Sequence, residues 1–161
     1  MTEVHTASAA QTEALAARLC AALSGRERAF IALFGEMGVG KTAFTRGFCR
    51  GLGIAGVHSP TFTVVNEYHT GTRPVYHFDF YRVEEEDELL SIGFDEYLQK
   101  DGFCLSEWSE NVTDFLPEDA VRVTLSRTDG GDGRCLRFTG LTGAEECALC
   151  AVGQASGKET K

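Results

Sequence analysis

Hydrophobic side chains near the start of the chain recur at the spacing of an α-helix. Apolar residues from Leu15 to Leu23 fall three or four positions apart, which places them on one helical face. The segment 8–11 (Ser-Ala-Ala-Gln) has capping-box spacing, and Gly25 supplies a stop. The pattern therefore predicts an amphipathic helix over residues 8–24.

Two short segments are apolar without alternation, namely residues 29–34 (Ala-Phe-Ile-Ala-Leu-Phe) and 103–105 (Phe-Cys-Leu). Such runs are typical of strands that are buried on both faces, as in a parallel sheet. A glycine-rich loop follows the first run. After that loop, a helix is predicted over 43–52, ending at Gly53.

Residues 61–68 and 75–80 are rich in β-branched and aromatic side chains, and the turn-like segment 69–74 separates them. This arrangement predicts a β-hairpin, and hence an antiparallel element beside the parallel strands. The other predicted elements are one or two short helices over 84–98 with a break at Gly93, a short helix over 109–116, a pair of strands at 120–126 and 135–139, and a short helix that follows 142–145.

Composition and charge indicate a globular domain and argue against a nucleic-acid-binding or membrane protein. The chain has 161 residues, of which 43% are hydrophobic and 24% charged, as in an ordinary globular domain. Its formal net charge is −9 with 15 Lys and Arg, which argues against a protein that binds DNA or RNA by itself. No segment resembles a membrane span or a signal peptide. We therefore expect a cytoplasmic protein that does not bind membranes.

The cysteines sit mostly as single residues inside apolar stretches, as expected of small packing residues in a reducing compartment. Cys147 and Cys150 form a C-x-x-C pair, but no second pair or histidine accompanies it, whereas a structural zinc site needs about four ligands. Packing is therefore the preferred interpretation for all of them: Cys20, Cys49, Cys104, Cys135, Cys147 and Cys150.

The glycine-rich loop carries the strongest chemical signal. Gly35, Gly40, Lys41 and Thr42 match G-x-x-x-x-G-K-[ST], directly after a predicted buried strand and before a helix. Glycines let successive amide groups point at phosphate oxygens, the lysine reaches the β and γ phosphates, and the threonine hydroxyl binds Mg²⁺. The motif predicts a nucleotide site in an α/β fold: a single P-loop NTPase domain with a mixed, mostly parallel sheet, an inserted β-hairpin and flanking helices. The predicted domain spans 1–152, followed by a flexible tail at 153–161.

A nucleotide site also needs an acid for the metal or the attacking water. Asp79 and Glu107 each close an apolar strand, so both are expected at the sheet edge where phosphates bind. The segment 58–61 (His-Ser-Pro-Thr) fits either a loop that senses the γ-phosphate or a plain turn, and both interpretations stay open. Trp108 fits either a core position or a contact surface.

Four motifs occur in order: GEMGVGKTAFTRGF (35–48), SPTFTVVNEY (59–68), YHFDFYR (76–82) and CLSEWSE (104–110). Together they resemble the bacterial TsaE (YjeE) family, over residues 6 to 140. The resemblance implies a compact P-loop ATPase that binds ATP and Mg²⁺ and hydrolyses ATP slowly. It also implies TsaD and TsaB as partners in making tRNA threonylcarbamoyladenosine, with tRNA reached only through them. The ATP cycle of the family member would reset that complex between turnovers.

The resemblance also implies site residues. Lys41, Asp79 and Glu107 would be catalytic, with Thr42, Glu107 and Asp79 around the metal and Trp108 toward a partner. The nucleotide-binding set would be Thr6, Thr12, Gly35, Glu36, Met37, Gly38, Val39, Gly40, Lys41, Thr42, Ala43, Ser59, Thr61 and Arg134. Glu36 stands where the family more often has Asp, and Ser109 where it more often has Pro.

Two alternatives remain. Small P-loop kinases have a similar length but need a lid with clustered arginines, and the arginines here, at 46, 50, 73 and 82, are scattered. A regulatory GTPase commonly carries an Asn-Lys-x-Asp motif, which this sequence lacks. The preferred hypothesis is therefore an accessory ATPase, with a small-molecule kinase as the alternative.

Overall fold

The computed structural model describes residues 1–60, 63–128 and 131–150. Thr61, residues 129–130 between the two late predicted strands, and the predicted tail at 153–161 lie outside the described residues. Among the described residues, no helix has both the length and the hydropathy needed to cross a membrane.

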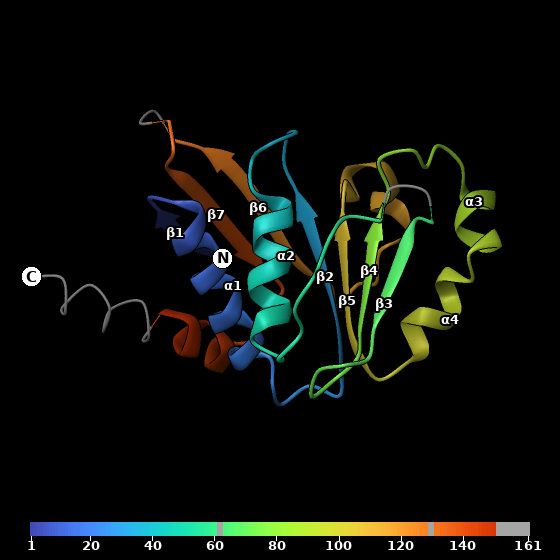
Figure 1. Ribbon diagram of the computed structural model, residues 1–161, viewed down its shortest axis with the longest axis horizontal. Coiled ribbons are helices and arrows are strands. Elements are labelled where there is room, and N and C mark those ends of the chain that lie inside the picture. The colour runs from blue at the N-terminus through green and yellow to red at the C-terminus, as the bar shows by residue number, and fades with distance from the viewer. Residues whose placement is uncertain (61–62, 129–130, 151–161) are drawn as a thin grey trace, which may run out of the picture.

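A mixed seven-stranded sheet forms the centre of the protein, in the order β1-β7-β6-β2-β5-β4-β3 (Figure 1). β4, β5, β2 and β6 are neighbours that run parallel, whereas β3 and β7 run antiparallel to their neighbours. The structure thus confirms the predicted mixed, mostly parallel sheet with its added hairpin, β3–β4. The strands are β1 (Thr2–Thr6), β2 (Arg28–Phe34), β3 (Val65–Tyr68), β4 (Val75–Asp79), β5 (Gly102–Glu107), β6 (Val121–Arg127) and β7 (Arg134–Thr139).

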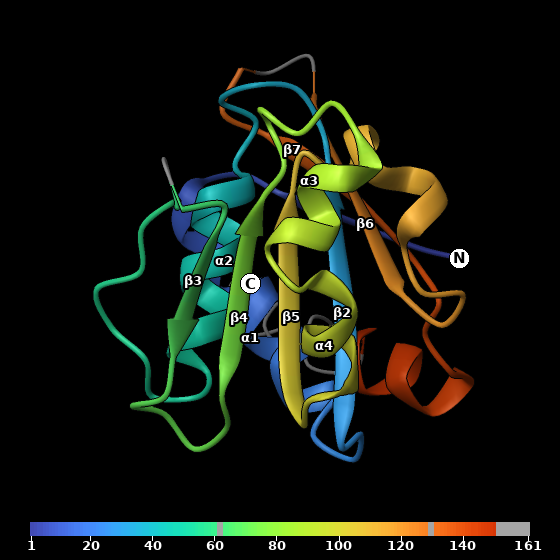
Figure 2. The same ribbon diagram turned by 90° about the vertical axis from the view of Figure 1, so that its right-hand side faces the viewer.

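Helices cover both faces of the sheet. Figure 2 shows α3 and α4 in front of the strands and α1 and α2 behind them. The helices are α1 (Ala9–Ala22), α2 (Lys41–Arg50), α3 (Glu86–Ser91), α4 (Phe94–Gln99) and the 3₁₀ helix η1 (Ser109–Phe115), followed by a helix over 143–150.

Alternation along the strands divides the core into two layers. Val75, Phe103 and Leu105 belong to the cluster that packs against α1 and α2. Tyr76 and Phe78 point the other way and join the cluster under α3 and α4. Because side chains two positions apart share a face, the polar ends of β4 and β5 are directed toward α2.

The two helices behind the sheet cross closely at Gly47. A Cβ at this position would lie 2.1 Å from the backbone oxygen of Glu13. Gly47→Ala therefore forces α1 away from α2, and we expect a loss of about 2–3 kcal/mol of unfolding free energy in urea denaturation. Gly25→Ala is the matched control, since a Cβ there meets no atom within 4 Å. Equal stability of the two variants would contradict the close crossing.

A side chain caps both predicted helix starts in the structure, and the capping box is reciprocal at the final helix. Ser8 Oγ accepts the amide of Gln11 at 3.2 Å at the start of α1. At the final helix, the Thr142 and Glu145 side chains each accept the other residue's backbone N–H, at 3.2 and 2.8 Å. These contacts fix where the two helices begin.

Three sequence-based expectations need correction. β1 was not expected, because its residues are mostly polar and it is held by pairing with β7. The helix at 109–116 is a 3₁₀ helix, and Val112 inside it has non-helical dihedral angles. Packing explains four of the cysteines, which are buried, but Cys147 is exposed and Cys150 is only half-buried.

Glu145 also anchors the final helix to the body of the domain. Its carboxylate accepts bonds from Arg26 at 2.8 and 2.6 Å, and the Glu145 side chain is only 12% exposed. Arg26 first, and then the Thr142 amide, lower the pKa of Glu145 from 4.5 to about 2.

Because the folded-state pKa lies below the unfolded value, this stabilisation is complete above pH 4.5 and is lost as the pH falls toward 2. Glu145→Gln should therefore cost about 1–2 kcal/mol at neutral pH, and the difference from the wild type should shrink in acid. Urea denaturation across pH would measure it. Asp101→Asn is the control, because its partner Arg28 is 3.5 Å away and the Asp101 side chain is 75% exposed. A difference that does not vary with pH would contradict the assignment.

Candidate nucleotide site

The glycine-rich loop joins β2 to α2 in a tight turn that only glycine can follow. Gly35, Gly38 and Gly40 all have positive φ, at 147°, 76° and 116°. A Cβ at Gly35 would lie 2.7 Å from the backbone oxygen of Leu125. The loop therefore has the compact backbone of a phosphate cradle, and α2 begins at Lys41 with its amino-terminal end toward it.

Lys41 is folded into this loop. It is 5% exposed, its Nζ donates to the Gly35 carbonyl, and the same atom lies 3.5 Å from the centroid of the Trp108 ring. Burial lowers the pKa of Lys41, while the charges of Glu110, Glu107 and Asp79 oppose that shift. The ammonium group is thus held at the loop by an aromatic face and by surrounding carboxylates.

Thr42 and Glu107 meet across the loop and the end of β5. Thr42 Oγ1 donates to Glu107 Oε1 at 3.0 Å, and Ser59 Oγ lies 3.2 Å from the same hydroxyl. Glu107 is 3% exposed, and its other oxygen lies 2.6 Å from Nε2 of His77. A hydroxyl and a carboxylate are hard oxygen donors, which is the donor type that Mg²⁺ prefers.

Asp79 is the second acid of the site. It pairs in register with Glu107 across β4 and β5, and its Oδ1 accepts the Tyr81 amide at 2.9 Å. Burial and then the charge of Glu107 raise the pKa of Asp79, against the opposing effects of the Tyr81 amide, His77 and Lys41. The sequence placed both acids at this sheet edge, and the structure brings them together there.

A cavity of about 340 Å³ connects these groups. It is lined by Met37, Gly38, Gly40, Lys41, Thr42, Ala43, Arg46, Ser59, Asp79, Glu107 and Trp108. The cavity thus holds a lysine, an arginine, two hydroxyls and two carboxylates, which is the donor set needed to bind phosphates and a divalent cation.

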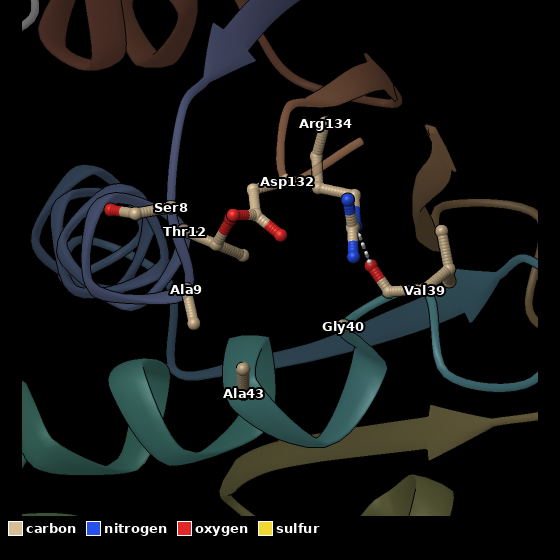
Figure 3. Close-up of a pocket in the computed structure, with 8 residues that line it drawn as sticks. All are labelled: Ser8, Ala9, Thr12, Val39, Gly40, Ala43, Asp132 and Arg134. Atoms are coloured by element: carbon tan, nitrogen blue, oxygen red, sulfur yellow. Dashed lines mark hydrogen bonds between the residues drawn. The ribbon is translucent and has the colours of Figure 1, made fainter. Parts of the chain in front are cut away.

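A second cavity of about 310 Å³ lies on the other side of Gly40 and Ala43, between α1 and β7 (Figure 3). Ser8, Ala9, Thr12, Val39, Asp132 and Arg134 complete its lining. Arg134 Nε donates to the Val39 carbonyl at 2.7 Å, which ties β7 to the phosphate loop. The two cavities share Gly40 and Ala43 in their lining, so they lie next to each other.

The other predicted site residues that the structure describes differ in whether they line one of the two cavities. The Thr6 and Thr12 hydroxyls lie 2.7 Å apart and satisfy each other, and Thr6 does not line the cavity. Glu36 is exposed and pairs with Arg127 at 2.9 Å, while Met37 is 65% exposed. Trp108, which fits either a core position or a contact surface in the sequence, has its ring over Lys41 and 5.0 Å from the ring of Tyr81.

Three residues of the site were missed in the sequence. His77 bonds Glu107, Glu110 Oε2 accepts the Gly35 amide at 2.8 Å, and Asp132 enters the second cavity. His77 gave one usable signal, because it precedes Asp79 by two positions and must share its face of β4. Glu110 and Asp132 lie in segments without regular hydrophobic spacing, and no comparable signal marks them.

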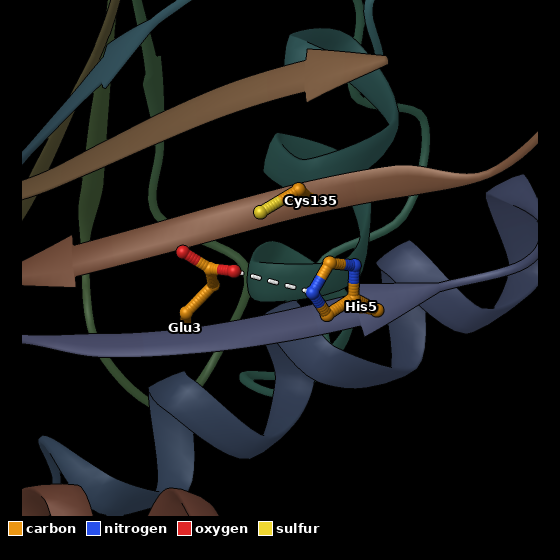
Figure 4. Close-up of side chains that lie close together, drawn as sticks. All are labelled: Glu3, His5 and Cys135. Atoms are coloured by element: carbon orange, nitrogen blue, oxygen red, sulfur yellow. Dashed lines mark hydrogen bonds and ion pairs between the residues drawn. The ribbon is translucent and has the colours of Figure 1, made fainter. Parts of the chain in front are cut away.

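Another group of ligand-type side chains lies at the β1–β7 edge (Figure 4). Atoms of Glu3, His5 and Cys135 come within 4.8 Å of one another. Arg137 Nε pairs with Glu3 at 3.0 Å, so the carboxylate already has a cation beside it. This cluster is therefore explained as an ion-pair network that ties β1 to β7.

Comparison with known proteins agrees with the geometry. The family model described as "Threonylcarbamoyl adenosine biosynthesis protein TsaE" matches residues 6–135. The Bacillus subtilis protein of that name is 45% identical over 112 residues, 69% of each chain, and the Haemophilus influenzae protein is 43% identical over 98 residues, covering 60% of this chain and 62% of its own. The crystal structure of Bacillus subtilis YdiB superposes with a TM-score of 0.75 at 32% identity, covering 96% of this chain and 95% of its own. With a family match over most of its length and this fold, the chain belongs to the TsaE family.

Proposed function

We propose that this protein is an ATPase of tRNA threonylcarbamoyladenosine biosynthesis, which binds ATP with Mg²⁺ and hydrolyses it. The observation that carries the proposal is the meeting of Lys41 and Thr42 with Glu107 and Asp79 in one cavity. These are the parts that phosphoryl transfer requires: a cation for the phosphates, oxygen ligands for a metal, and a further acid.

ATP would lie with its phosphates in the first cavity and its adenosine in the second. Gly40 and Ala43 stand at the junction, where the amino-terminal end of α2 favours negative charge. In the second cavity, the Asp132 carboxylate offers an acceptor for an exocyclic amine. Adenine and guanine both carry such an amine, so the choice of ATP over GTP rests instead on the absence of an Asn-Lys-x-Asp motif from the sequence.

Each polar side chain of the first cavity would have a separate role. Lys41 would leave the Gly35 carbonyl and pair with the β and γ phosphates. Thr42 and Glu107 would hold Mg²⁺, and bound Mg²⁺ neutralises charge on the phosphate oxygens. Asp79, whose Oδ1 accepts the Tyr81 amide, is the acid that would orient the attacking water.

The lining of the cavity favours water as the phosphate acceptor. Arg46 is the single arginine among the described residues that line it, and that side chain is 47% exposed and lies 3.9 Å from Glu13. A kinase that transfers phosphate to a small molecule usually closes several arginines over the reaction. The useful product would then be a conformational change that a partner senses, and the proposed partners are TsaD and TsaB.

The test compares binding and hydrolysis with and without those partners. Calorimetry should give tighter binding of ATP than of GTP, and phosphate release should be slow alone and faster when TsaD and TsaB are added. Equal rates with and without the partners would overturn the accessory role. Transfer of labelled phosphate to nucleosides would instead support the kinase alternative.

A further inference from the structure

We propose that His77 is a positioning residue for Glu107, holding its carboxylate in the orientation that a metal ion with Thr42 requires. The effect on metal binding rests on the proposed function, whereas the contact between His77 and Glu107 does not. His77 is fully buried, and its Nε2 lies 2.6 Å from Glu107 Oε2. His77 is not among the residues that the sequence predicts at the nucleotide or the metal.

The register of the sheet creates the contact. His77 stands opposite Leu105, and Asp79 stands opposite Glu107. His77 and Glu107 are therefore diagonal neighbours on the face toward α2, a separation that two long side chains can bridge. The polar pair is enclosed by strands whose other inward residues are apolar, such as Val75 and Phe103.

The two oxygens of Glu107 have separate partners. Oε1 accepts from the Thr42 hydroxyl, and Oε2 faces His77 Nε2. The terminal torsion of a glutamate is otherwise broad, so a contact at each oxygen is what fixes the plane of the carboxylate. His77 thereby keeps Glu107 Oε1 directed at Thr42. In that position, Glu107 Oε1 and Thr42 Oγ1 can bind the same cation.

The second ring nitrogen supports this role. Among the described residues, Nδ1 of His77 is buried without a hydrogen-bond partner. A carboxylate accepts, so Nε2 donates to Glu107 and is the ring nitrogen that has a partner. An apolar side chain would fill this strand position without an unpaired nitrogen. The imidazole is accounted for by its bond to Glu107 rather than by packing.

The decisive variants are His77→Gln and His77→Asn. The amide nitrogen of glutamine reaches about the position of Nε2, whereas that of asparagine falls near Nδ1 and cannot reach Glu107. We expect His77→Gln to stay within about fivefold of the wild type in the Mg²⁺ concentration that half-saturates ATP hydrolysis. His77→Asn should need about 10- to 100-fold more Mg²⁺, the usual loss when a ligand's outer hydrogen bond is removed. Metal-free ATP binding should be similar in both.

A purely structural role would lower the stability of both variants without separating them in their Mg²⁺ requirement. Equal Mg²⁺ requirements in His77→Gln and His77→Asn, with both proteins folded by circular dichroism, would therefore overturn the proposal.

If the wild type itself fails to bind or hydrolyse ATP, the proposed function fails, and the contact is still tested in the nucleotide-free protein. There, ¹H–¹⁵N spectra should show a hydrogen-bonded proton on Nε2 of His77 that changes in Glu107→Gln. An Nε2 signal that is insensitive to Glu107→Gln would overturn the positioning role independently of ATP.

Discussion

Lys41→Ala is expected to weaken ATP binding by at least about 100-fold, because it removes a charge-assisted contact to phosphate from a buried site. The structure adds a second reason. Glu107, Glu110 and Asp79 surround the lysine, and their charges all raise its pKa. Without the ammonium group those carboxylates remain around the loop and repel the triphosphate. Isothermal titration calorimetry with ATP measures the loss.

Lys100→Ala is the matched control for this variant. Its ammonium group also lies over an aromatic ring, 4.7 Å from the centroid of Tyr97, but it borders a different cavity. That variant loses a cation–π contact and a surface charge without touching the phosphate loop, so its ATP affinity should match the wild type. Unchanged affinity in Lys41→Ala, with a folded protein by thermal melting, would contradict the assignment of the loop as the phosphate site.

Much of the fold follows from local patterns in the sequence. The apolar runs at 29–34 and 103–105 are typical of strands with two covered faces, and they lie in β2 and β5. The capping residues Ser8 and Thr142 stand where the helices begin, because the bonds they make lie within a few residues. β1 had no such local signal, since its pairing partner β7 is more than a hundred residues away.

In the candidate site, too, some residues have a local signal in the sequence and others do not. The loop motif and the acids at the strand ends were visible, because the carboxyl ends of parallel strands meet at one sheet edge. His77 and Glu110 act through sheet register and through the turn at Trp108, which has a left-handed backbone with φ 58°. Neither the register nor that turn is encoded by residues adjacent in sequence. The sequence therefore predicts the residues expected at the phosphates and the metal, whereas their hydrogen-bond partners His77 and Glu110 become apparent only in the structure.

Exchanging the two carboxylates one at a time should separate their roles. Glu107→Gln preserves the shape of the side chain and a partner for His77, so it is a cleaner test than Glu107→Ala, which leaves that imidazole unpaired. It should retain ATP binding but require far more Mg²⁺ for turnover. Asp79→Asn should keep the Mg²⁺ requirement while lowering kcat by about 100- to 10,000-fold, the range for a lost general base.

The stability of Asp79→Asn shows whether its loss of activity comes from the reaction step or from a damaged fold. Burial raises the pKa of Asp79 above its ordinary value of 3.8, so the ionised carboxylate is a cost to the nucleotide-free protein at neutral pH. Asp79→Asn removes that cost and should raise the melting temperature, by an amount that fades as the pH falls toward 3.8 and the wild-type group gains a proton. A variant that is more stable yet inactive would place the defect in the reaction. Loss of stability together with activity, or the same Mg²⁺ requirement in Glu107→Gln as in the wild type, would refute this division of roles.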